Sequence, residues 1–198
     1  MNCEYVVSID CSISSTGISV FEIKTGKTFL YCYSDKIRKK DDPISFKKNN
    51  IEVLVERQPK KDTFPDTFSR YINATEHIFE IINKRINDNV FVFIEGYSFA
   101  SKGMLFSIGE FCSLLKYQFY KTGVTICEVS PSEWKKEILG NGSSKKDEIY
   151  NFHYENDLSE ILKEFEKMNY IYKKGSFLED LCDCYSIQKY TLKKFNKT

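Results

Sequence analysis

Short runs of apolar residues, either continuous or alternating with polar ones, predict five β-strands. The first covers residues 4–10, and residues 18–34 contain two more, joined at 24–27 by a glycine-containing turn that is typical of a hairpin. Further strands are expected at 89–96 and 123–129. The first three strands therefore form a hairpin portion, and a segment long enough for a helix precedes each of the last two.

Apolar residues spaced three and four apart predict the helices. One is expected at 70–87 and another along 105–119. Residues 130–133 read Ser-Pro-Ser-Glu, a capping box with proline at the first helical position, and they predict a helix that stops at Gly140. Three more helices are expected at the following places: near Ser143 or Ser144, near Asp157, and at 178–194.

Three strands in hairpin order, followed by alternating helices and strands, are typical of an α/β protein. We expect a mixed five-stranded sheet in which the hairpin portion joins parallel strands, with helices on both faces. No repeat or domain boundary is evident, so 1–198 is expected to form a single domain. Residues 35–69 are polar and charged and hold three of the four prolines, and we interpret them as a long irregular excursion.

Composition narrows the class of protein. The formal net charge is +1, but many lysines come in pairs, which permits basic stripes balanced by acidic groups elsewhere. The seven cysteines lack the paired spacing of a zinc site or a disulfide framework, so reduced thiols in a cytosolic protein are expected. The longest apolar run, at 90–94, is too short to cross a membrane, and no secretory leader is expected.

Acidic residues stand at the ends of two predicted buried strands, Asp10 and Glu95. In open α/β sheets the chemistry gathers at this edge. Asp180 and Asp183 lie three apart on one face of an otherwise apolar helix, where like charges are costly unless a cation neutralises them. Four convergent carboxylates are a site for hard divalent cations such as Mg²⁺. Two such ions about 4 Å apart can activate a water and steady the leaving oxygen of a phosphodiester.

The segment 134–150 reads WKKEILGNGSSKKDEIY, with two glycines around an asparagine and a lysine pair on each side. Glycines let a backbone approach a ligand closely, and a helix N-terminus offers free N–H groups to an anion. The composition therefore suggests a phosphate cradle, for either a nucleotide or a nucleic-acid backbone.

Together these segments resemble a Holliday junction resolvase of the RuvC type, within the ribonuclease-H-like superfamily. SIDCSISSTGISVF resembles its first strand, turn and second strand, and FIEGYSFASKG with SIGE resembles its Glu-bearing strand end and next helix. PSEWKKEILGNGSSKKDEI resembles its Lys-x-x-x-x-Gly-x-Gly-x-x-x-Lys segment, and EDLCDCYSI its closing D-x-x-D helix. The likeness covers about 4–24, 90–149 and 178–190, in the family's order.

This resemblance implies roles for individual residues. The metal-binding and catalytic carboxylates would be Asp10, Glu95, Asp180 and Asp183. Two basic catalytic residues near the scissile phosphate would be Lys135 and Lys146, which makes the glycine-lysine segment a cradle for a DNA backbone. The residues expected to bind DNA are Tyr97, Phe99, Lys102, Lys136, Gly140, Asn141, Gly142, Ser143 and Lys145.

The sequence departs from the family pattern at two of the matched positions. An aromatic wedge three residues after the catalytic Glu is replaced by Ser98, so Phe99, and next to it Tyr97, are the candidates for stacking on bases. Cys184 stands where the family has a small alanine after the last Asp. The excursion at 35–69 has no counterpart in the resemblance.

The function implied is a metal-dependent endodeoxyribonuclease that resolves four-way junctions and other branched DNA in recombination or replication. Mg²⁺ is the expected cofactor, with two ions per site and Mn²⁺ able to substitute. Two symmetric cuts require a two-fold homodimer, for which the helix at 104–121 is the candidate surface. The expected location is the cytoplasm, or a site of viral DNA replication if a virus encodes the protein, with no membrane partner.

Three other functions remain open. ATP-binding proteins of the actin and sugar-kinase type also have a phosphate loop after a strand-end Asp, but their glycine two residues on is Ser12 here. A non-catalytic DNA-branch-binding protein is the second alternative, although loss of a carboxylate, which would favour it, is not seen. The third is a ribonuclease H, a transposase-like enzyme or a looser nuclease that uses the same carboxylates on another substrate.

Overall fold

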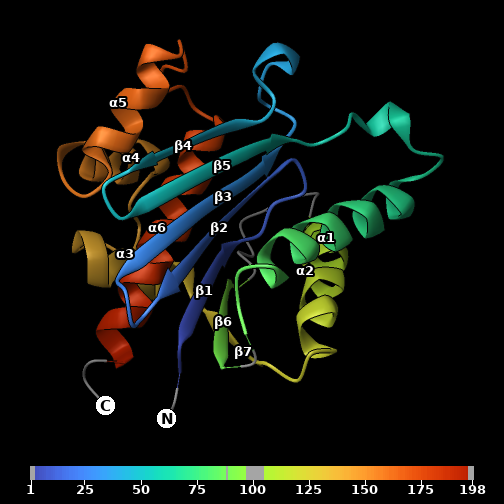
Figure 1. Ribbon diagram of the computed structural model, residues 1–198, viewed down its shortest axis with the longest axis horizontal. Coiled ribbons are helices and arrows are strands. Elements are labelled where there is room, and N and C mark those ends of the chain that lie inside the picture. Colours follow the sequence, from blue (N-terminus) through green and yellow to red (C-terminus); the bar gives the residue numbers. More distant parts are fainter. Residues whose placement is uncertain (1–2, 88, 97–104, 196–198) are drawn as a thin grey trace.

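A mixed sheet of seven strands runs through the centre of the molecule (Figure 1). The computed structural model describes residues 3–87, 89–96 and 105–195. The strand order is β4-β5-β3-β2-β1-β6-β7. The strands are β1 (Tyr5–Asp10), β2 (Ser15–Glu22), β3 (Lys27–Ser34), β4 (Ile44–Lys48), β5 (Ile51–Arg57), β6 (Val90–Glu95) and β7 (Thr125–Val129). All but β2 and β4 run in one direction, so five strands end at the same edge of the sheet.

Two groups of helices cover the two faces of the sheet, as predicted. The helices are α1 (Thr67–Asn83), α2 (Leu105–Tyr120), α3 (Pro131–Leu139), α4 (Lys146–Glu155), α5 (Ser159–Lys167) and α6 (Phe177–Phe195). α1 and α2 lie on one face, and α3 to α6 lie on the other (Figure 1). Each group buries its own apolar cluster against alternate residues of the strands. Within the described residues, no helix has the length and apolar character needed to cross a membrane.

Helix α6 is the central helix of its face. It packs directly on β1, β2 and β3, while α3 and α4 pack against its other sides. Where β2 meets it, the residues Ser15, Gly17 and Ser19 are small, and these let the helix approach closely. Gln188 of α6 bonds across this contact, accepting from the Ser19 hydroxyl and donating to Thr28 Oγ1. The close contact brings the first turns of α6 to the edge where β1 ends.

The segment 35–69 is not the irregular excursion that we predict from its polarity. It contains β4 and β5, the short 3₁₀ turns η1 (Lys39–Asp41) and η2 (Lys61–Thr63), and the start of α1. The two strands form a hairpin in which Asn49 takes a left-handed φ of 51°. β5 then pairs in parallel with β3. The hairpin raises the strand count from the predicted five to seven.

Two helix starts and one helix cap also differ from the prediction. α1 begins at residue 67 because Asp66 caps it, its carboxylate accepting from the Ser69 N–H at 2.7 Å. α3 begins after Ser130 as expected, but the Ser130 side chain does not cap it and instead pairs with Ser132. α4 begins two or three residues later than expected, at residue 146, where Glu148 accepts from the backbone N–H of Lys145.

Candidate active site

Four carboxylates converge at the edge where β1 and β6 end. Asp10 is the last residue of β1, and Glu95 is the last residue of the neighbouring parallel strand β6. Asp180 and Asp183 lie one turn apart at the start of α6, and with Asp10 they are at most 5% exposed. The structure therefore brings together the four acidic side chains that the sequence singles out.

Crowding of these acidic groups changes their proton affinity. Burial and the charge of Asp10 raise the pKa of Asp180 to about 6. Burial and Asp10 raise the pKa of Asp183 to about 7, although Lys146 opposes the shift. Burial also holds the pKa of Glu95 well above its usual value, and the charges of Asp10 and Asp183 add to this effect. The cluster thus favours a bound proton or a bound cation over four free charges.

Lys146 supplies one such cation. From the first position of α4, its ammonium lies 2.5 Å from Asp183 Oδ2, 3.7 Å from Asp10 Oδ2 and 3.8 Å from Asp180 Oδ1. Burial lowers the pKa of this lysine, but the three carboxylates outweigh burial and raise it overall. The side chain is still 42% exposed, so its ammonium sits at the mouth of the cluster.

A second lysine reaches the cluster from an unexpected direction. Lys36, just after β3, places its ammonium 3.3 Å from Asp180 Oδ2. Lys36 is not among the predicted site residues, because it belongs to a polar stretch with no counterpart in the resemblance. No local signal marks it, because its position depends on where the loop after β3 meets α6. Asp180 is thus held between Lys36 and Lys146.

Trp134 orients the fourth carboxylate. Its side chain is fully buried under α3, and its indole Nε1–H donates to Glu95 Oε1 at 3.0 Å. A donor on one oxygen leaves the other free to face the remaining acidic groups. The tryptophan therefore acts as a core residue and also as a support for the site.

The donor set fits a hard divalent cation. Asp10 Oδ2 and Asp183 Oδ1 are buried and accept no hydrogen bond from the described residues. Carboxylate oxygens of this kind are the ligands that Mg²⁺ prefers. In the described part of the chain, no three acidic, cysteine or histidine side chains stand in a ready metal-binding arrangement, and the Lys146 ammonium lies among the carboxylates instead.

The glycine-asparagine-glycine segment links α3 to α4 beside this cluster. Gly140 ends α3 with a left-handed φ of 82°, and a Cβ on Gly142 would come within 2.8 Å of the Ser132 carbonyl oxygen. Asn141 folds the loop, its Oδ1 accepting from the N–H and the hydroxyl of Ser143. The backbone conformation at Gly140 and the lack of space at Gly142 therefore both favour glycine, independently of any ligand.

The other residues predicted for DNA binding are only partly placed together. Lys135 and Lys145 line a hollow that also contains Lys146, whereas Lys136 is exposed on the outside of α3. Lys135 lies against the face of Trp134 and forms no ion pair with the described carboxylates. Three of the predicted DNA-binding residues, Tyr97, Phe99 and Lys102, lie outside the described residues.

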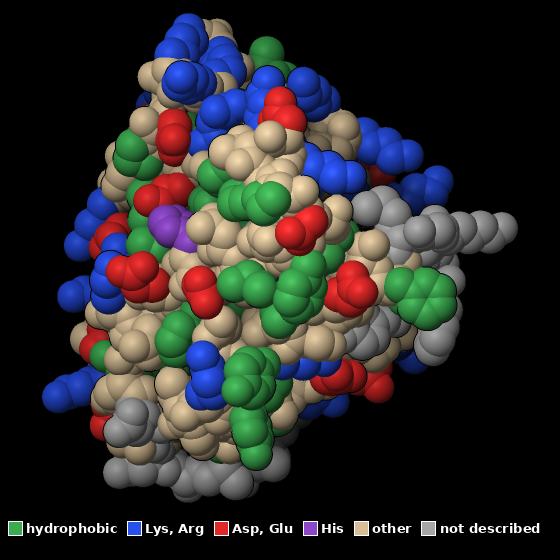
Figure 2. Space-filling model, turned by 90° about the vertical axis from the view of Figure 1, so that its right-hand side faces the viewer, with side chains coloured by type: hydrophobic (Ala, Val, Ile, Leu, Met, Phe, Trp, Pro, Cys, Tyr) green, Lys and Arg blue, Asp and Glu red, His purple; other side chains and the backbone are tan. Residues whose placement is uncertain are grey.

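Lys and Arg side chains gather at the upper end of the face shown in Figure 2. Figure 1 places η1 and η2 at that end. Four lysines of these loops, Lys39, Lys40, Lys60 and Lys61, are exposed and take part in no ion pair with the rest of the described chain. Exposed cations thus border the edge of the sheet at which the carboxylates lie.

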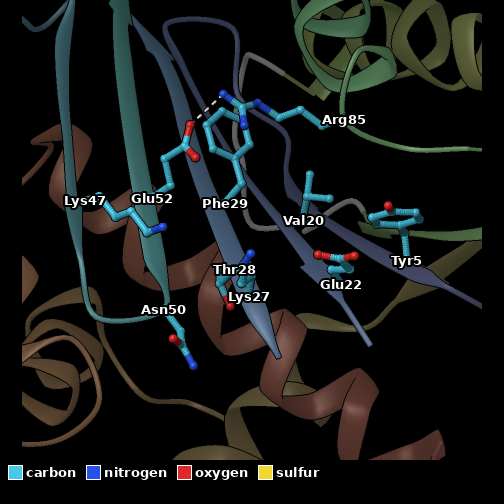
Figure 3. Close-up of a pocket in the computed structure, with 10 residues that line it drawn as sticks. All are labelled: Tyr5, Val20, Glu22, Lys27, Thr28, Phe29, Lys47, Asn50, Glu52 and Arg85. Atoms are coloured by element: carbon cyan, nitrogen blue, oxygen red, sulfur yellow. Dashed lines mark hydrogen bonds and ion pairs between the residues drawn. The ribbon is translucent and has the colours of Figure 1, made fainter. Parts of the chain in front are cut away.

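A separate hollow of about 150 Å³ lies at the opposite edge of the sheet (Figure 3). Arg85 reaches across it, stacking 3.5 Å from the centre of the Phe29 ring and pairing with Glu52 at 2.7 Å. The charge of Arg85 is therefore already paired within the chain. None of the four convergent carboxylates lines it, so the site described above is independent of this hollow.

The sheet order, the helices on both faces and the carboxylates at the strand ends define a ribonuclease-H-like α/β fold. Comparison with solved structures shows which proteins have a similar fold. RuvC of Thermus thermophilus is similar with a TM-score of 0.58 and 14% identity over 96% of both chains. T. thermophilus RuvC in complex with a Holliday junction substrate gives 0.55 and 13% identity, covering 95% of this chain and 94% of that one.

The yeast mitochondrial Holliday junction resolvase is also similar, with a TM-score of 0.53 and 13% identity over 94% of this chain and 76% of that chain. These likenesses confirm the RuvC-type fold that the sequence predicts. No protein-family model matches the chain, and a search of curated proteins finds no match.

Proposed function

We propose that this protein is a metal-dependent endonuclease that cuts branched DNA, with the four-way junction as its main substrate. The observation that carries the proposal is the convergence of Asp10, Glu95, Asp180 and Asp183 beside a lysine-lined hollow. The fold likeness supports it, since one of the similar structures holds a Holliday junction substrate.

The four carboxylates would hold Mg²⁺ or Mn²⁺, two ions per site, which would activate a water for attack on the phosphodiester and stabilise the leaving oxygen. The chain's own residues prepare this site. Trp134 holds Glu95 in place, and the backbone of α6 holds Asp180 and Asp183 against β1. With the site loaded, Lys146 would leave the carboxylates, and its ammonium would then face the scissile phosphate at the mouth of the cluster.

Paired cutting of a four-way junction requires two sites related by two-fold symmetry, so we propose a homodimer. The inner side of α2 is taken up by the core, where Phe111, Cys112, Leu115 and Phe119 are buried. Its outer side carries Phe106, Tyr117 and Tyr120, which are 57–88% exposed. This outer side replaces the inner apolar repeat as the candidate surface. A monomeric mass in solution together with paired cutting would contradict the dimer.

Cleavage of four-way, three-way, flap and RNA–DNA hybrid substrates side by side, in Mg²⁺, tests the proposed function. We expect the four-way junction to be cut fastest and all cutting to stop with chelator. Asp10→Asn should abolish cutting while leaving junction binding largely intact, because backbone binding rests on lysines. Preference for the hybrid would favour a ribonuclease H, and binding without cutting would favour a non-catalytic branch-binding protein.

A further inference from the structure

A groove of about 490 Å³ opens beside the carboxylates, on the side of Lys146. Four lysines line it: Lys135, Lys145, Lys146 and Lys174. They come from α3, from the start of α4 and from the loop between α5 and α6. The groove therefore adjoins the carboxylate cluster through Lys146 and lies between elements that are distant in the sequence.

The charge of this groove is strongly one-sided. Asp147 is the one acidic residue among those that line it. Lys146 pairs with the carboxylate cluster, but Lys135, Lys145 and Lys174 form no ion pair with the described residues. Three uncompensated ammonium groups in a single hollow attract a polyanion rather than a small neutral ligand.

The loop that carries Lys174 is held in a fixed place. Tyr172 stacks on Tyr150 of α4 with ring centres 4.1 Å apart. The Tyr172 hydroxyl and the Gly175 N–H both donate to Glu179 Oε1, at 3.1 and 3.0 Å. Glu179 is buried in the first turn of α6, directly before Asp180. Lys174 is therefore tied to the helix that carries two of the carboxylates.

Lys173, the neighbour of Lys174 in the chain, provides a control. Lys173 is exposed like Lys174 and lies next to it in the chain, yet it does not line the groove. In the sequence the two residues cannot be distinguished, because both belong to one pair of surface lysines. The structure separates them, because only Lys174 shares a hollow with Lys146.

We propose that this groove binds the phosphodiester backbone next to the bond that is cut, and that Lys174 is one of its phosphate contacts. This inference rests on the proposed function, since it assumes DNA at the carboxylates. A strand whose scissile phosphate lies at Lys146 would carry its neighbouring phosphates past Lys135, Lys145 and Lys174. Backbone contacts of this kind position a substrate without reading its sequence.

The test compares Lys174→Ala with Lys173→Ala, both in the Asp10→Asn protein, which we expect to bind without cutting. Affinity for a labelled four-way junction is measured between 50 and 200 mM salt, a range over which backbone contacts lose affinity steeply. Lys174→Ala should reduce the slope of log affinity against log salt by about 1 and weaken binding about fivefold at the lowest salt. Lys173→Ala should change both quantities much less.

The possible failures are distinguishable. Equal effects of the two substitutions would overturn the groove and leave a generic basic surface. A parent protein that binds no DNA at all would instead overturn the proposed function. A third variant, Tyr172→Phe, removes the hydroxyl that ties the loop to Glu179. It should weaken binding when Lys174 is present and have no further effect in Lys174→Ala, and additive losses would contradict the role of the loop.

Discussion

The backbone of Asp180 lies where a side chain on Gly17 would have to be. A Cβ on Gly17 would come within 2.1 Å of the Asp180 carbonyl oxygen and 3.3 Å of its Cα. Gly17 is also the residue that pairs with Asp10 across β1 and β2. A single glycine thus sets the spacing between the strand that carries one carboxylate and the helix that carries two others.

Gly17→Ala should therefore move α6 and disturb the site at the same time. Overpacking of this kind costs about 1–3 kcal/mol, which lowers the melting temperature by roughly 2–12 °C in a chain of this size. Affinity for Mn²⁺ should fall as well, because the carboxylates separate. Gly109→Ala in α2 is the control, since a Cβ there has no neighbour within 4 Å. A Gly17→Ala protein with unchanged stability and metal affinity would contradict this account.

Lys146 and a divalent cation should compete for the same carboxylates. Lys146→Met removes the ammonium that now lies among Asp10, Asp180 and Asp183. Hydrogen bonds to charged groups contribute about 1.5–3 kcal/mol, so Mn²⁺ should bind at least about tenfold more tightly. Cutting should nevertheless slow at least about tenfold, because the cation is lost from the transition state.

Lys145→Met is the matched control for this pair of effects, because Lys145 is exposed and pairs with no carboxylate of the cluster. It should leave Mn²⁺ affinity unchanged and mainly weaken DNA binding. Titration calorimetry measures the metal affinity without any cutting. Weaker Mn²⁺ binding by Lys146→Met would show that the lysine supports the metal site rather than competes with it.

The stability of the metal-free protein should depend on pH through Asp183. Its pKa is about 7 when folded, against an ordinary value of 3.8. The proton held by the folded state therefore stabilises it fully at low pH, and this stabilisation is lost as the pH rises through 7. The Asp183→Asn variant has no such proton to release. Its melting temperature relative to that of the parent should therefore rise by about 5 °C or more between pH 5 and pH 8.

Comparing the two proteins at each pH removes the contribution of titrating groups that lie away from the acidic cluster. His153, whose pKa burial lowers to about 4, acts in the opposite direction below pH 6.5, and it does so equally in both proteins. Saturating Mg²⁺ should narrow the gap at pH 8, because it stabilises the parent. A gap that stays constant from pH 5 to pH 8 would mean that Asp183 is not the group responsible.

Lys36 should tune the proton affinity of Asp180. Its ammonium, 3.3 Å from Asp180, favours the carboxylate form. Lys36→Ala should therefore raise the pKa of Asp180 above its present value of about 6, by up to about one unit, and Lys36→Arg should preserve it. NMR titration of the side-chain carboxyls measures this directly. Lys39→Ala, from the same loop, should have no effect, and an equal shift in both variants would contradict the contact.

The sequence predicts those parts of the fold that depend on local pattern. Apolar runs that end in Asp10 and Glu95, and the three-residue spacing of Asp180 and Asp183, are visible without a structure, and the structure brings all four together. Their chemical roles stay predictions. The hairpin of β4 and β5 is missed because lysines and glutamates at exposed or half-buried positions hide the alternation of buried Ile44, Val53 and Val55.

Long-range contacts set the features that the sequence does not predict. β5 pairs in parallel with β3, and no turn or local sequence pattern in either segment predicts that pairing. Lys36 is positioned by its contact with Asp180, which is 144 residues away in the chain. The loop that carries Lys174 is positioned in part by the stacking of Tyr172 on Tyr150 of α4. The signal that could have found the hairpin is the Asn49–Asn50 turn between two strand-like runs, which is typical of a tight hairpin.

The position of α6 has a consequence for the order in which the molecule becomes functional. The helix fills the core on its face through Leu178, Leu181 and Ile187, and it also brings two of the four carboxylates. Asp10 and Glu95 precede it in the chain, so they are synthesised before Asp180 and Asp183. Closure of that hydrophobic core and completion of the acidic cluster are therefore one event. A nascent or partly unfolded chain has neither, so any reaction that needs all four carboxylates is confined to molecules that have finished folding.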